Sequence, residues 1–477
     1  MSKDTLAVIV KRMNTKEVAQ QIIKTAKAKG ADFCEVVVSQ NEFSLKRIKQ
    51  GQVDQPPARE QWEIDLAIVK NNHKRAITFD NPLFAKQAVE QTLLQMELLP
   101  RQKVFIPTEA CASIAQPSAL YDEKTAQLLD EYLLDIARQA ESQLKEQKLY
   151  VSGKIGQGRG EITYQNSLGT KQTALFTLAT AALYAFDEQN QSISAYANSG
   201  GTSLNHIDVN RMVQELIQKC ELQRSAKTVD IFEGKKAGED VIIDVIVEPY
   251  VLAEIFGWFG FFGFNGLLVE RGESFISDKM RQKVMGKNIT ITDDPKHPEN
   301  KGMGLPFDFE GHPRSKTFLI EHGVAKNAAY DSELAHVFNK QTTATALPPS
   351  ARSEGSVPFD IAVEGGETAI EDMIARSKKQ TLWITKPHYV AMKHSKTCTM
   401  TGVFHHGVFL VENGKVAAPV ENVRFEQNMV EAFSQVEEIS PSRLVFDPRS
   451  LSFPAGVVVP AMKIKNFRFV GSTDRSA

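Results

Sequence analysis

Residues 242–247 read Ile-Ile-Asp-Val-Ile-Val, a nearly continuous run of β-branched side chains. A run of this kind is typical of a strand that is buried on both faces of a sheet. The segment before it, Ser225–Asp240, is polar and contains two glycines, which indicates a connection between domains. Because 477 residues exceed what one hydrophobic core usually holds, we expect two domains, 1–228 and 229–477.

The second half of the chain is predicted to be dominated by β-structure. Short apolar stretches bounded by Pro and Gly follow one another along it, as expected for strands joined by turns. The strand candidates are 288–291, 317–321, 382–385, 407–412 and 461–469. The clearest helix is Glu367–Lys378. This pattern indicates a strongly curved or barrel-like sheet.

The first half of the chain mixes helices with strands. Asn14 and Glu17 form a capping-box pattern in front of a run with helical apolar spacing. Further helices are expected at 83–99, 122–149 (as one helix or two) and 208–223, and strands at 34–39, 43–48, 62–69, 162–164, 173–186 and 192–197. The predicted fold class is therefore α+β: an N-terminal domain with helices packed on an antiparallel sheet, followed by the β-rich domain.

The composition is that of an ordinary soluble protein. Hydrophobic residues make up 42% of the chain, charged residues 24%, and the formal net charge is −2. Nucleic-acid binding normally needs a basic face, so we expect no nucleic-acid partner. The aromatic run Phe256–Phe264 is far shorter than the roughly 20 residues of a membrane span, and the apolar run Leu6–Val10 is too short for a secretion signal. A cytoplasmic protein without membrane contact is expected.

Cysteines and histidines form no recognised metal-binding motif. The four cysteines (Cys34, Cys111, Cys220 and Cys398) include no CxxC pair, and their low number fits a reducing cytosol. HExxH and HExxxH, which bring two imidazoles to one Zn²⁺ and place a glutamate beside it, are both absent.

One cluster combines the two residue types: His394, Cys398, His405 and His406. If this stretch is extended, residues four apart lie about 13 Å from each other, whereas ligands of one zinc sit about 2.0–2.3 Å from the metal. His405 and His406 would also point to opposite faces. We therefore interpret the cluster as strand side chains rather than metal ligands.

Four acidic residues form another candidate site. Asp308 and Glu310 would share a face in an extended chain, and paired carboxylates serve acid–base chemistry or bind hard cations. However, Asp-Asp-Pro around Asp293 and Asp294, and Phe-Glu-Gly-His-Pro at 309–313, are strong turn sequences. The turn interpretation is therefore favoured for all four.

Two stretches are rich in glycine. Glycines at 153, 156, 158 and 160 match neither GxGxxG nor GxxxxGK[ST], so a flexible loop is predicted rather than a phosphate loop. Residues 256–264 read Phe-Gly-Trp-Phe-Gly-Phe-Phe-Gly-Phe, with glycine at every third position. On a helix this spacing allows close backbone approach, which favours core or subunit-interface packing over a ligand cage.

From about Asp240 onward, an ordered series of motifs resembles the TldD/PmbA family of peptidase-related proteins. The matching stretches are Val-Glu-Pro at 247–249, Glu-Arg-Gly-Glu-Ser-Phe at 270–275, Ile-Thr-Asp-Asp-Pro at 291–295, Leu-Pro-Phe-Asp-Phe-Glu-Gly at 305–311, Leu-Ile-Glu-His-Gly-Val at 319–324, Tyr-Asp at 330–331, Leu-Trp-Ile-Thr at 382–385, Thr-Gly at 401–402, Leu-Val-Glu-Asn-Gly-Lys at 410–415 and Val-Pro-Ala-Met-Lys at 459–463. The resemblance is specific because the order of the series is kept.

In that family, TldD-type subunits hold a catalytic zinc through HExxxH and a cysteine nearer the C-terminus. PmbA-type subunits, also called TldE, lack the motif and pair with TldD. Counting without gaps from the matched motifs on either side places the first histidine at Gly257, the glutamate at Trp258 and the second histidine at Phe262. The cysteine position falls near Phe446, and residues 445–460 contain no cysteine.

The resemblance therefore implies a PmbA/TldE-like, non-zinc subunit of a cytoplasmic heterodimeric peptidase. A TldD-like partner would supply the zinc and the general base. This chain would supply half of an enclosed chamber for unfolded peptides, bound extended by strand addition. No catalytic, cofactor-binding or metal-ligating residue is assigned to this chain.

Two alternatives remain open. One is a non-catalytic homodimer that binds peptides or modulates another protein, in line with the family's older label as a modulator of DNA gyrase. The other is a metal-independent enzyme that uses the regions of Asp293 and Asp294 or of His394 and Cys398.

Overall fold

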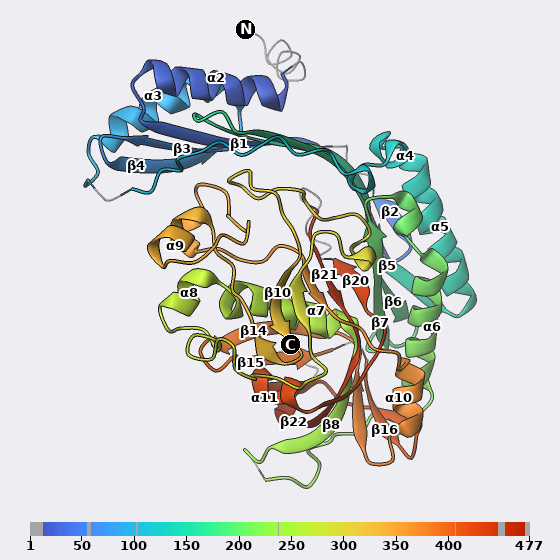
Figure 1. The fold of residues 1–477 in the computed structure, drawn as a ribbon. Helices are drawn as coiled ribbons and strands as arrows, with labels where there is room; N and C mark the ends of the chain where they lie inside the picture. The colour runs from blue at the N-terminus through green and yellow to red at the C-terminus, as the bar shows by residue number, and fades with distance from the viewer. Residues whose placement is uncertain are drawn as a thin grey trace.

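A computed structural model describes residues 13–54, 59–101, 104–236, 238–405, 407–446 and 454–472. A long curved sheet from the N-terminal half arches over the C-terminal half, and helices cover its outer face (Figure 1). The predicted α+β class is therefore confirmed.

In the described part of the chain, the N-terminal sheet has seven antiparallel strands in the order β4-β3-β1-β5-β6-β7, with β2 beside β1. The strands are β1 (Phe33–Lys49), β2 (Gln52–Asp54), β3 (Arg59–Lys70), β4 (His73–Phe79), β5 (Leu149–Asn166), β6 (Lys171–Asp187) and β7 (Ser194–Gly201). The predicted strands at 34–39 and 43–48 are one continuous strand, β1.

The helices on this sheet are α2 (Thr15–Ala28), α3 (Ala85–Met96), α4 (Glu123–Ala126), α5 (Asp130–Glu146) and α6 (Val209–Arg224). The N-cap part of the capping-box prediction is confirmed, because the Glu17 backbone N–H donates to Asn14 Oδ1 at 2.9 Å. The segment 122–149 forms two helices, since Leu128 between them has φ 52°, in the left-handed region that ends a helix.

The prediction of a glycine-rich flexible loop at 153–160 is wrong. All four glycines lie inside β5, which pairs with β1 on one side and β6 on the other. A Cβ atom at Gly153 would lie 2.2 Å from the Ala182 carbonyl oxygen, and one at Gly160 would meet the Asn41 side chain at 2.3 Å. Gly153 and Gly160 are therefore needed for close approach within a crowded sheet.

The C-terminal half contains two sheets, as far as its described residues go. A nine-stranded sheet curves into a half-barrel, which confirms the expected curved, β-rich architecture. Its strands are β14 (Pro387–His394), β15 (Thr399–Phe404), β18 (Val423–Asn428), β22 (Met462–Ser472), β8 (Val241–Val247), β13 (Thr381–Ile384), β16 (Val408–Glu412) and β17 (Lys415–Pro419), with β19 (Val436–Ile439) beside β22.

A six-stranded sheet is packed beside it in the described structure. Its strands, in spatial order, are β11 (Val324–Ala325), β10 (Thr317–Glu321), β9 (Ile291–Asp293), β12 (Ile361–Val363), β21 (Gly456–Val459) and β20 (Arg443–Phe446). The helices of this half are α7 (Pro249–Trp258), α8 (Gly266–Glu270), α9 (Ser332–Val337), α10 (Ile370–Arg376) and α11 (Met429–Ser434).

Strand β8 is buried on both faces only at its end. Val245, Ile246 and Val247 are buried, whereas Ile242 is exposed. The expectation that residues 242–247 are all buried on both faces is therefore too broad. Burial increases along β8 and is complete where the strand leads into α7.

The two halves share hydrophobic clusters. In one of them, Val37 and Ile162 from the N-terminal sheet pack with Phe307 and Phe309 from the C-terminal half. The arching sheet is thus fastened to the body beneath it by apolar contact. The boundary between 228 and 229 stays a prediction.

A buried group of charges adds a second link between the halves. Lys219 of α6 is buried, and its ammonium group lies 2.8 Å from carboxylate oxygens of both Glu215 and Glu248. Burial alone would raise the pKa of Glu215, but the neighbouring cations Lys219, Arg443 and Arg211 lower it to about 2. Glu248 occupies the residue between β8 and α7, so this cluster fixes where α7 begins.

Replacing Lys219 with Met is expected to destabilise the fold by about 3–5 kcal/mol, because two buried carboxylates lose their shared cation. Chemical denaturation measures the change in the free energy of unfolding. Arg138→Ala is the control, since it removes an exposed ion pair on α5 and should cost less than about 0.5 kcal/mol. Equal, small effects of both substitutions would contradict the structural role of Lys219.

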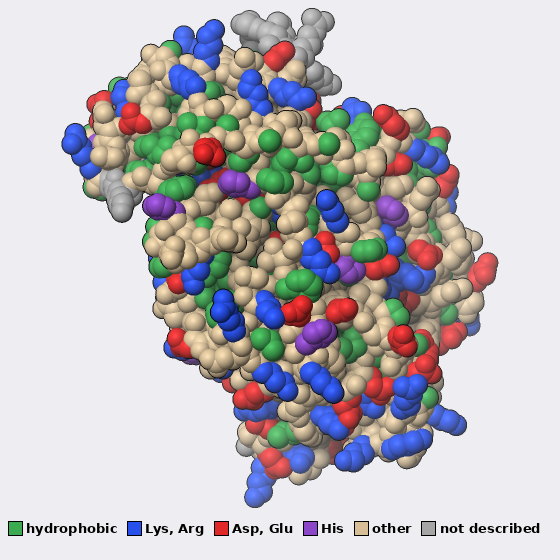
Figure 2. Space-filling view, viewed as in Figure 1, with side chains coloured by type: hydrophobic (Ala, Val, Ile, Leu, Met, Phe, Trp, Pro, Cys, Tyr) green, Lys and Arg blue, Asp and Glu red, His purple; other side chains and the backbone are tan. Residues whose placement is uncertain are grey.

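No helix within the described residues is long and apolar enough to cross a membrane. Charged side chains of both signs are interspersed over the face drawn in Figure 2.

Candidate functional site

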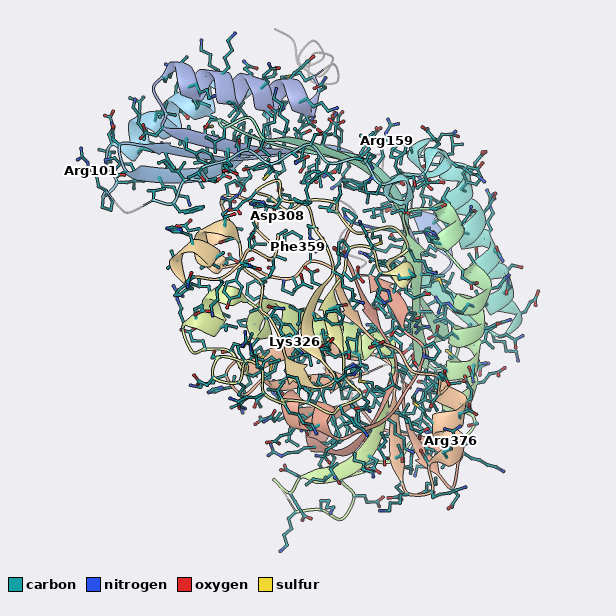
Figure 3. The ribbon with its side chains drawn as sticks, in the orientation of Figure 1. Arg101, Arg159, Asp308, Lys326, Phe359 and Arg376 are labelled. Carbon is teal, nitrogen blue, oxygen red and sulfur yellow. The ribbon has the colours of Figure 1, made fainter. Side chains whose placement is uncertain are left out.

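A pocket of about 1020 Å³ is lined by residues of both halves. The N-terminal sheet contributes β1, β5, β6 and β7, and the C-terminal half contributes α7, β14, β20 and the segment 357–361. Phe359, one of the lining residues, lies beneath the arching sheet in Figure 3.

Helix α7 forms one wall of the pocket. Pro249 occupies its first turn, where the missing backbone N–H costs no hydrogen bond. One helix face packs into the core through Val251, Leu252, Ile255 and Phe256. Tyr250, Ala253, Glu254 and Gly257 recur at three- and four-residue spacing and line the pocket on another face.

The aromatic run 256–264 serves both the core and the pocket. Phe256, Phe259 and Phe264 are buried in the main core, which confirms the packing interpretation for these rings. Phe261 is instead exposed and lines the pocket. The pocket wall was not predicted for this stretch, because the sequence does not tell which side of a helix faces a cavity.

A π-helical turn, η4 (Phe259–Gly263), directly follows α7. The Phe264 backbone N–H donates to the Phe259 carbonyl oxygen at 2.9 Å, across five residues instead of four. In a regular α-helix, residues five apart point about 140° away from each other, and a wider turn reduces that angle. The wider turn therefore brings residues five apart, such as Phe259 and Phe264, closer to one side of the helix.

Three of the four positions aligned with the zinc motif line the pocket: Gly257, Trp258 and Phe446. A side chain added at Gly257 would start in open space, with no atom within 4 Å of its Cβ. The Trp258 indole N–H donates to the Val390 carbonyl oxygen at 2.8 Å, and its ring stacks on Phe262 with 5.6 Å between centroids.

These residues do not fit a zinc ion. Glycine and phenylalanine carry no side-chain donor atom for a metal, and the indole nitrogen of Trp258 is only a hydrogen-bond donor. Among the residues that the structure describes, no three His, Cys, Asp or Glu side chains are grouped so that they could share a metal ion.

Another part of the pocket lining combines aromatic rings with a cation. The Lys386 ammonium donates to the Tyr184 hydroxyl at 2.9 Å and lies 4.6 Å from the centre of the Tyr196 ring. Tyr196 in turn meets Tyr250 edge to face at 5.2 Å. Lys386 is therefore held in place by rings at the pocket surface.

Positive charge predominates along the described lining. Its cationic side chains are Arg47, Lys49, Lys154 and Lys386, and its carboxylate is Glu254. A pocket with this balance favours ligands that carry negative charge.

Two sheet edges border the pocket. Within the described structure, β14 pairs only with β15, and β20 pairs only with β21. Both edge strands contribute lining residues, among them Tyr389 and Val445. Apart from the Val390 carbonyl, which accepts from Trp258, the unpaired backbone groups of such an edge strand can bind an extended peptide.

The acidic residues singled out in the sequence are structural. Asp308 Oδ1 accepts hydrogen bonds from the Glu310 and His312 backbone N–H groups, and Asp294 Oδ1 accepts one from Lys296. The turn interpretation is confirmed for these two aspartates. Asp293 lies in β9 instead, where its carboxylate is 2.8 Å from buried Arg314, so the turn interpretation is wrong for Asp293.

Glu310 is paired as well: its carboxylate lies 3.4 Å from Arg352 and accepts a hydrogen bond from the Ser332 backbone at 3.0 Å. The turn sequence at 309–313 therefore brings Glu310 into contact with segments far along the chain.

The histidine–cysteine cluster is not a single extended strand. His394 ends β14, and the chain turns back so that the buried thiol of Cys398 directly precedes β15. His394 is exposed, which separates it from Cys398. His405 stacks on His388 at 4.7 Å, and His406 lies outside the described residues. The extended geometry assumed for this stretch is therefore wrong, because a turn intervenes.

Residues 241–471 match the family model described as the PmbA/TldA metallopeptidase C-terminal domain. The C-terminal half belongs to the PmbA/TldD family. A metalloprotease of Archaeoglobus fulgidus is 26% identical over 201 residues, which are 40% of this chain and 43% of the relative. A metalloprotease TldD homolog of Buchnera aphidicola is 22% identical over 220 residues, or 44% of either chain. The matches thus span less than half of these two relatives.

Solved structures show the same fold over nearly the whole chain. TldE from Thermococcus kodakarensis has a TM-score of 0.81 at 19% identity, over 95% of this chain and 100% of that one. A Thermotoga maritima protein, described as a candidate modulator of a DNA gyrase, has a TM-score of 0.77 at 16% identity, over 96% and 100%. The likeness at this identity concerns the fold.

Asp331 should make stability depend on pH. Its side chain caps α9, and burial followed by the charge of Glu310 raises its pKa to about 7. The folded state therefore binds a proton that the unfolded state releases near pH 4, so stability falls as pH rises from about 4 to 7. Asp331→Asn keeps the cap, and we expect it to be more stable than the wild type by about 2–3 kcal/mol at pH 8.

Denaturant titrations from pH 4 to 8 measure this difference. Asp135→Asn, at an exposed position of α5, is the control and should follow the wild-type curve. A difference between Asp331→Asn and wild type that does not change with pH would contradict the assigned role.

Proposed function

We propose that this chain is a PmbA/TldE-like subunit of a heterodimeric TldD-type metallopeptidase. The observation that carries the proposal is that the positions aligned with the zinc motif (Gly257, Trp258 and Phe446) gather at one pocket and offer no metal ligand. A TldD-like partner supplies the zinc and the general base. The likeness to TldE over 95% of the chain supports this assignment.

In this role, the pocket of the chain holds an unfolded peptide. The edges of β14 and β20 offer backbone hydrogen bonds to an extended segment, which tolerates many side chains. The tyrosine and phenylalanine rings of the lining supply apolar contact area. The cations Arg47, Lys49 and Lys386 favour substrates with acidic side chains or a free carboxylate in the pocket.

The central experiment is reconstitution with a zinc-binding chain. This chain and an HExxxH-containing TldD-type chain from the same genome are produced separately and together. We expect co-purification at equal stoichiometry, about one zinc per heterodimer, and cleavage of an unstructured acidic peptide by the mixture alone. Each chain by itself is the control for metal content and activity.

Other outcomes assign other functions. Stoichiometric zinc and peptide cleavage by this chain alone would refute the non-zinc role. Full activity of the TldD-type chain without this subunit would refute the subunit role. Exclusive self-association with peptide binding, and no association with the TldD-type chain, would favour the homodimeric peptide-binding or modulator alternative.

Lys386→Gln should weaken the binding of acidic peptide to the reconstituted complex by about fivefold, because it removes one pocket charge worth about 1 kcal/mol at a partly exposed site. Lys393→Gln is the matched control, since Lys393 lies in β14, the strand that begins directly after Lys386, but outside the pocket lining, where it pairs with Glu426. Fluorescence anisotropy with an acidic peptide and its amidated, neutral counterpart measures the effect. Equal weakening for both peptides would contradict a charge preference.

A further inference from the structure

Cys111 differs from the other three cysteines in its surroundings. Cys34, Cys220 and Cys398 are fully buried, whereas Cys111 is half-buried. Burial also raises the pKa of Cys220 to about 12. Reagents in solution therefore reach one thiol of the native fold far more readily than the others.

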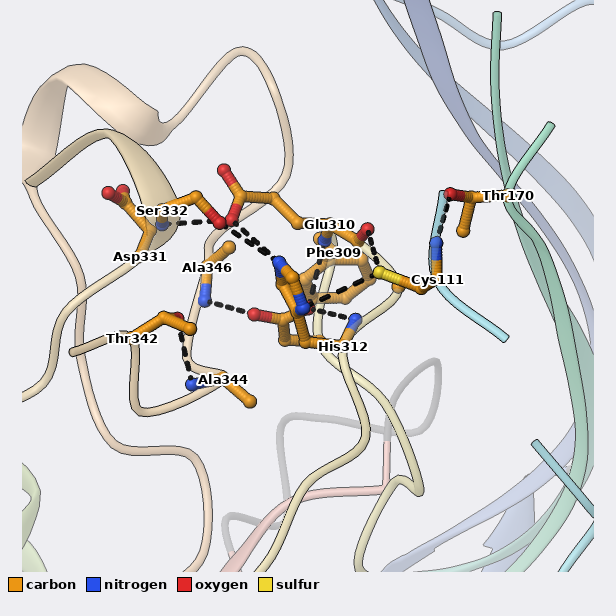
Figure 4. Close-up of polar contacts among 12 residues, drawn as sticks. Cys111, Thr170, Phe309, Glu310, His312, Asp331, Ser332, Thr342, Ala344 and Ala346 are labelled. Carbon is orange, nitrogen blue, oxygen red and sulfur yellow. Dashed lines mark hydrogen bonds and ion pairs between the residues drawn. The ribbon is translucent and has the colours of Figure 1, made fainter. Parts of the chain in front are cut away.

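The thiol lies beside the ring of His312, and a hydroxyl on the opposite side of that ring orients it (Figure 4). Cys111 Sγ lies 3.4 Å from His312 Nδ1. The other ring nitrogen, Nε2, lies 2.9 Å from Ser332 Oγ and 3.9 Å from Glu310 Oε2. An activated cysteine has three parts: a thiol, an imidazole beside it and a third group that orients the imidazole ring.

Both partners are held by their backbones. The Cys111 N–H donates to Thr170 Oγ1 at 3.0 Å, next to the turn between β5 and β6. The His312 N–H donates to Asp308 Oδ1 at 2.9 Å, and the other oxygen of Asp308 accepts from Ala346 at 3.0 Å. The pair thus joins the N-terminal sheet to a loop of the C-terminal half.

The surrounding charges favour a protonated imidazole. The pKa of His312 is raised to about 9, chiefly by its hydrogen bond with Cys111. Burial acts in the opposite direction, and the charges of Asp308 and Glu310 add to the increase. The remaining charged groups of the cluster are Asp331, Arg352, Glu35 and Glu333. Of these, Arg352 neutralises part of the negative charge of the cluster, because it forms ion pairs with both Glu35 and Glu310.

We infer that Cys111 is a modification site, at which His312 takes the thiol proton and holds the thiolate ready for small electrophiles and hydroperoxides. With hydrogen peroxide, the sulfur forms a bond to one oxygen and the O–O bond breaks. The sulfur is oxidised to a sulfenic acid and the peroxide is reduced, and the leaving hydroxide takes the imidazolium proton to become water. No step involves the pocket, so the inference is independent of the proposed peptidase role.

Alkylation of the native chain tests the inference. Iodoacetamide is added from pH 5.5 to 9.5, and mass spectrometry of peptides follows each cysteine. We expect Cys111 to be labelled at pH 6.5 while the three buried thiols stay unlabelled. An ordinary thiol is only about 1% ionised at that pH. In the urea-unfolded chain, iodoacetamide should therefore label Cys111 about tenfold more slowly than in the native chain.

The variant His312→Asn separates activation from mere exposure. Its Cys111 should be labelled about tenfold more slowly than wild type at pH 6.5, and at a rate within twofold of wild type at pH 9.5, where thiols ionise unaided. Continued protection of the three buried thiols from labelling shows that the variant keeps its fold. Ser332→Ala keeps the His312 imidazole but removes the hydroxyl that orients it, so this variant should give an intermediate labelling rate at pH 6.5.

Two results would overturn the inference. The first is an equal rate for wild type and His312→Asn across the pH range. The second is labelling of native Cys111 no faster than that of the unfolded chain at pH 6.5. A dimedone probe after peroxide treatment supplies an independent readout, and the absence of a sulfenic-acid adduct at Cys111 would refute the peroxide reaction.

Discussion

The ammonium group of Lys219, buried between two carboxylates, is the interaction on which the geometry of the pocket depends. Removing such a charge from water is costly, and the cost is offset only if both Glu215 and Glu248 stay in place. Glu248 is the last residue before α7, and Glu215 belongs to a helix of the other half. The requirement for charge pairing therefore fixes the wall formed by α7 relative to the arching sheet.

The architecture follows from this attachment. An arching antiparallel sheet cannot close on itself, so its concave face must be filled by the other half, through apolar clusters such as that of Val37 and Phe307. Beside the contact between Tyr250 of α7 and Tyr196 of β7, the two surfaces leave space, and the edges of β14 and β20 border it. A cavity bordered by unpaired strand edges is suited to extended chains.

Much of the fold could be predicted from local patterns, because caps, strand runs and turn aspartates such as Asp308 act within a few residues. The glycines of β5 were misjudged because the need for them arises from neighbours such as Ala182 and Asn41, which are distant in sequence. The pocket and the Cys111–His312 pair could not be predicted for the same reason. Their residues meet only through long-range packing, and no local pattern records it.

The positions aligned with the zinc motif are occupied by residues that pack instead of binding a metal. Deleting ligands from a metal site would normally leave polar groups unpaired in a buried space. Here the rings of Trp258 and Phe262 stack on each other, and the indole N–H donates a hydrogen bond to the Val390 carbonyl oxygen. Gly257 leaves its share of the cavity open. The π-helical turn that follows α7 adds to this wall, so its shape is held by backbone geometry and ring contacts.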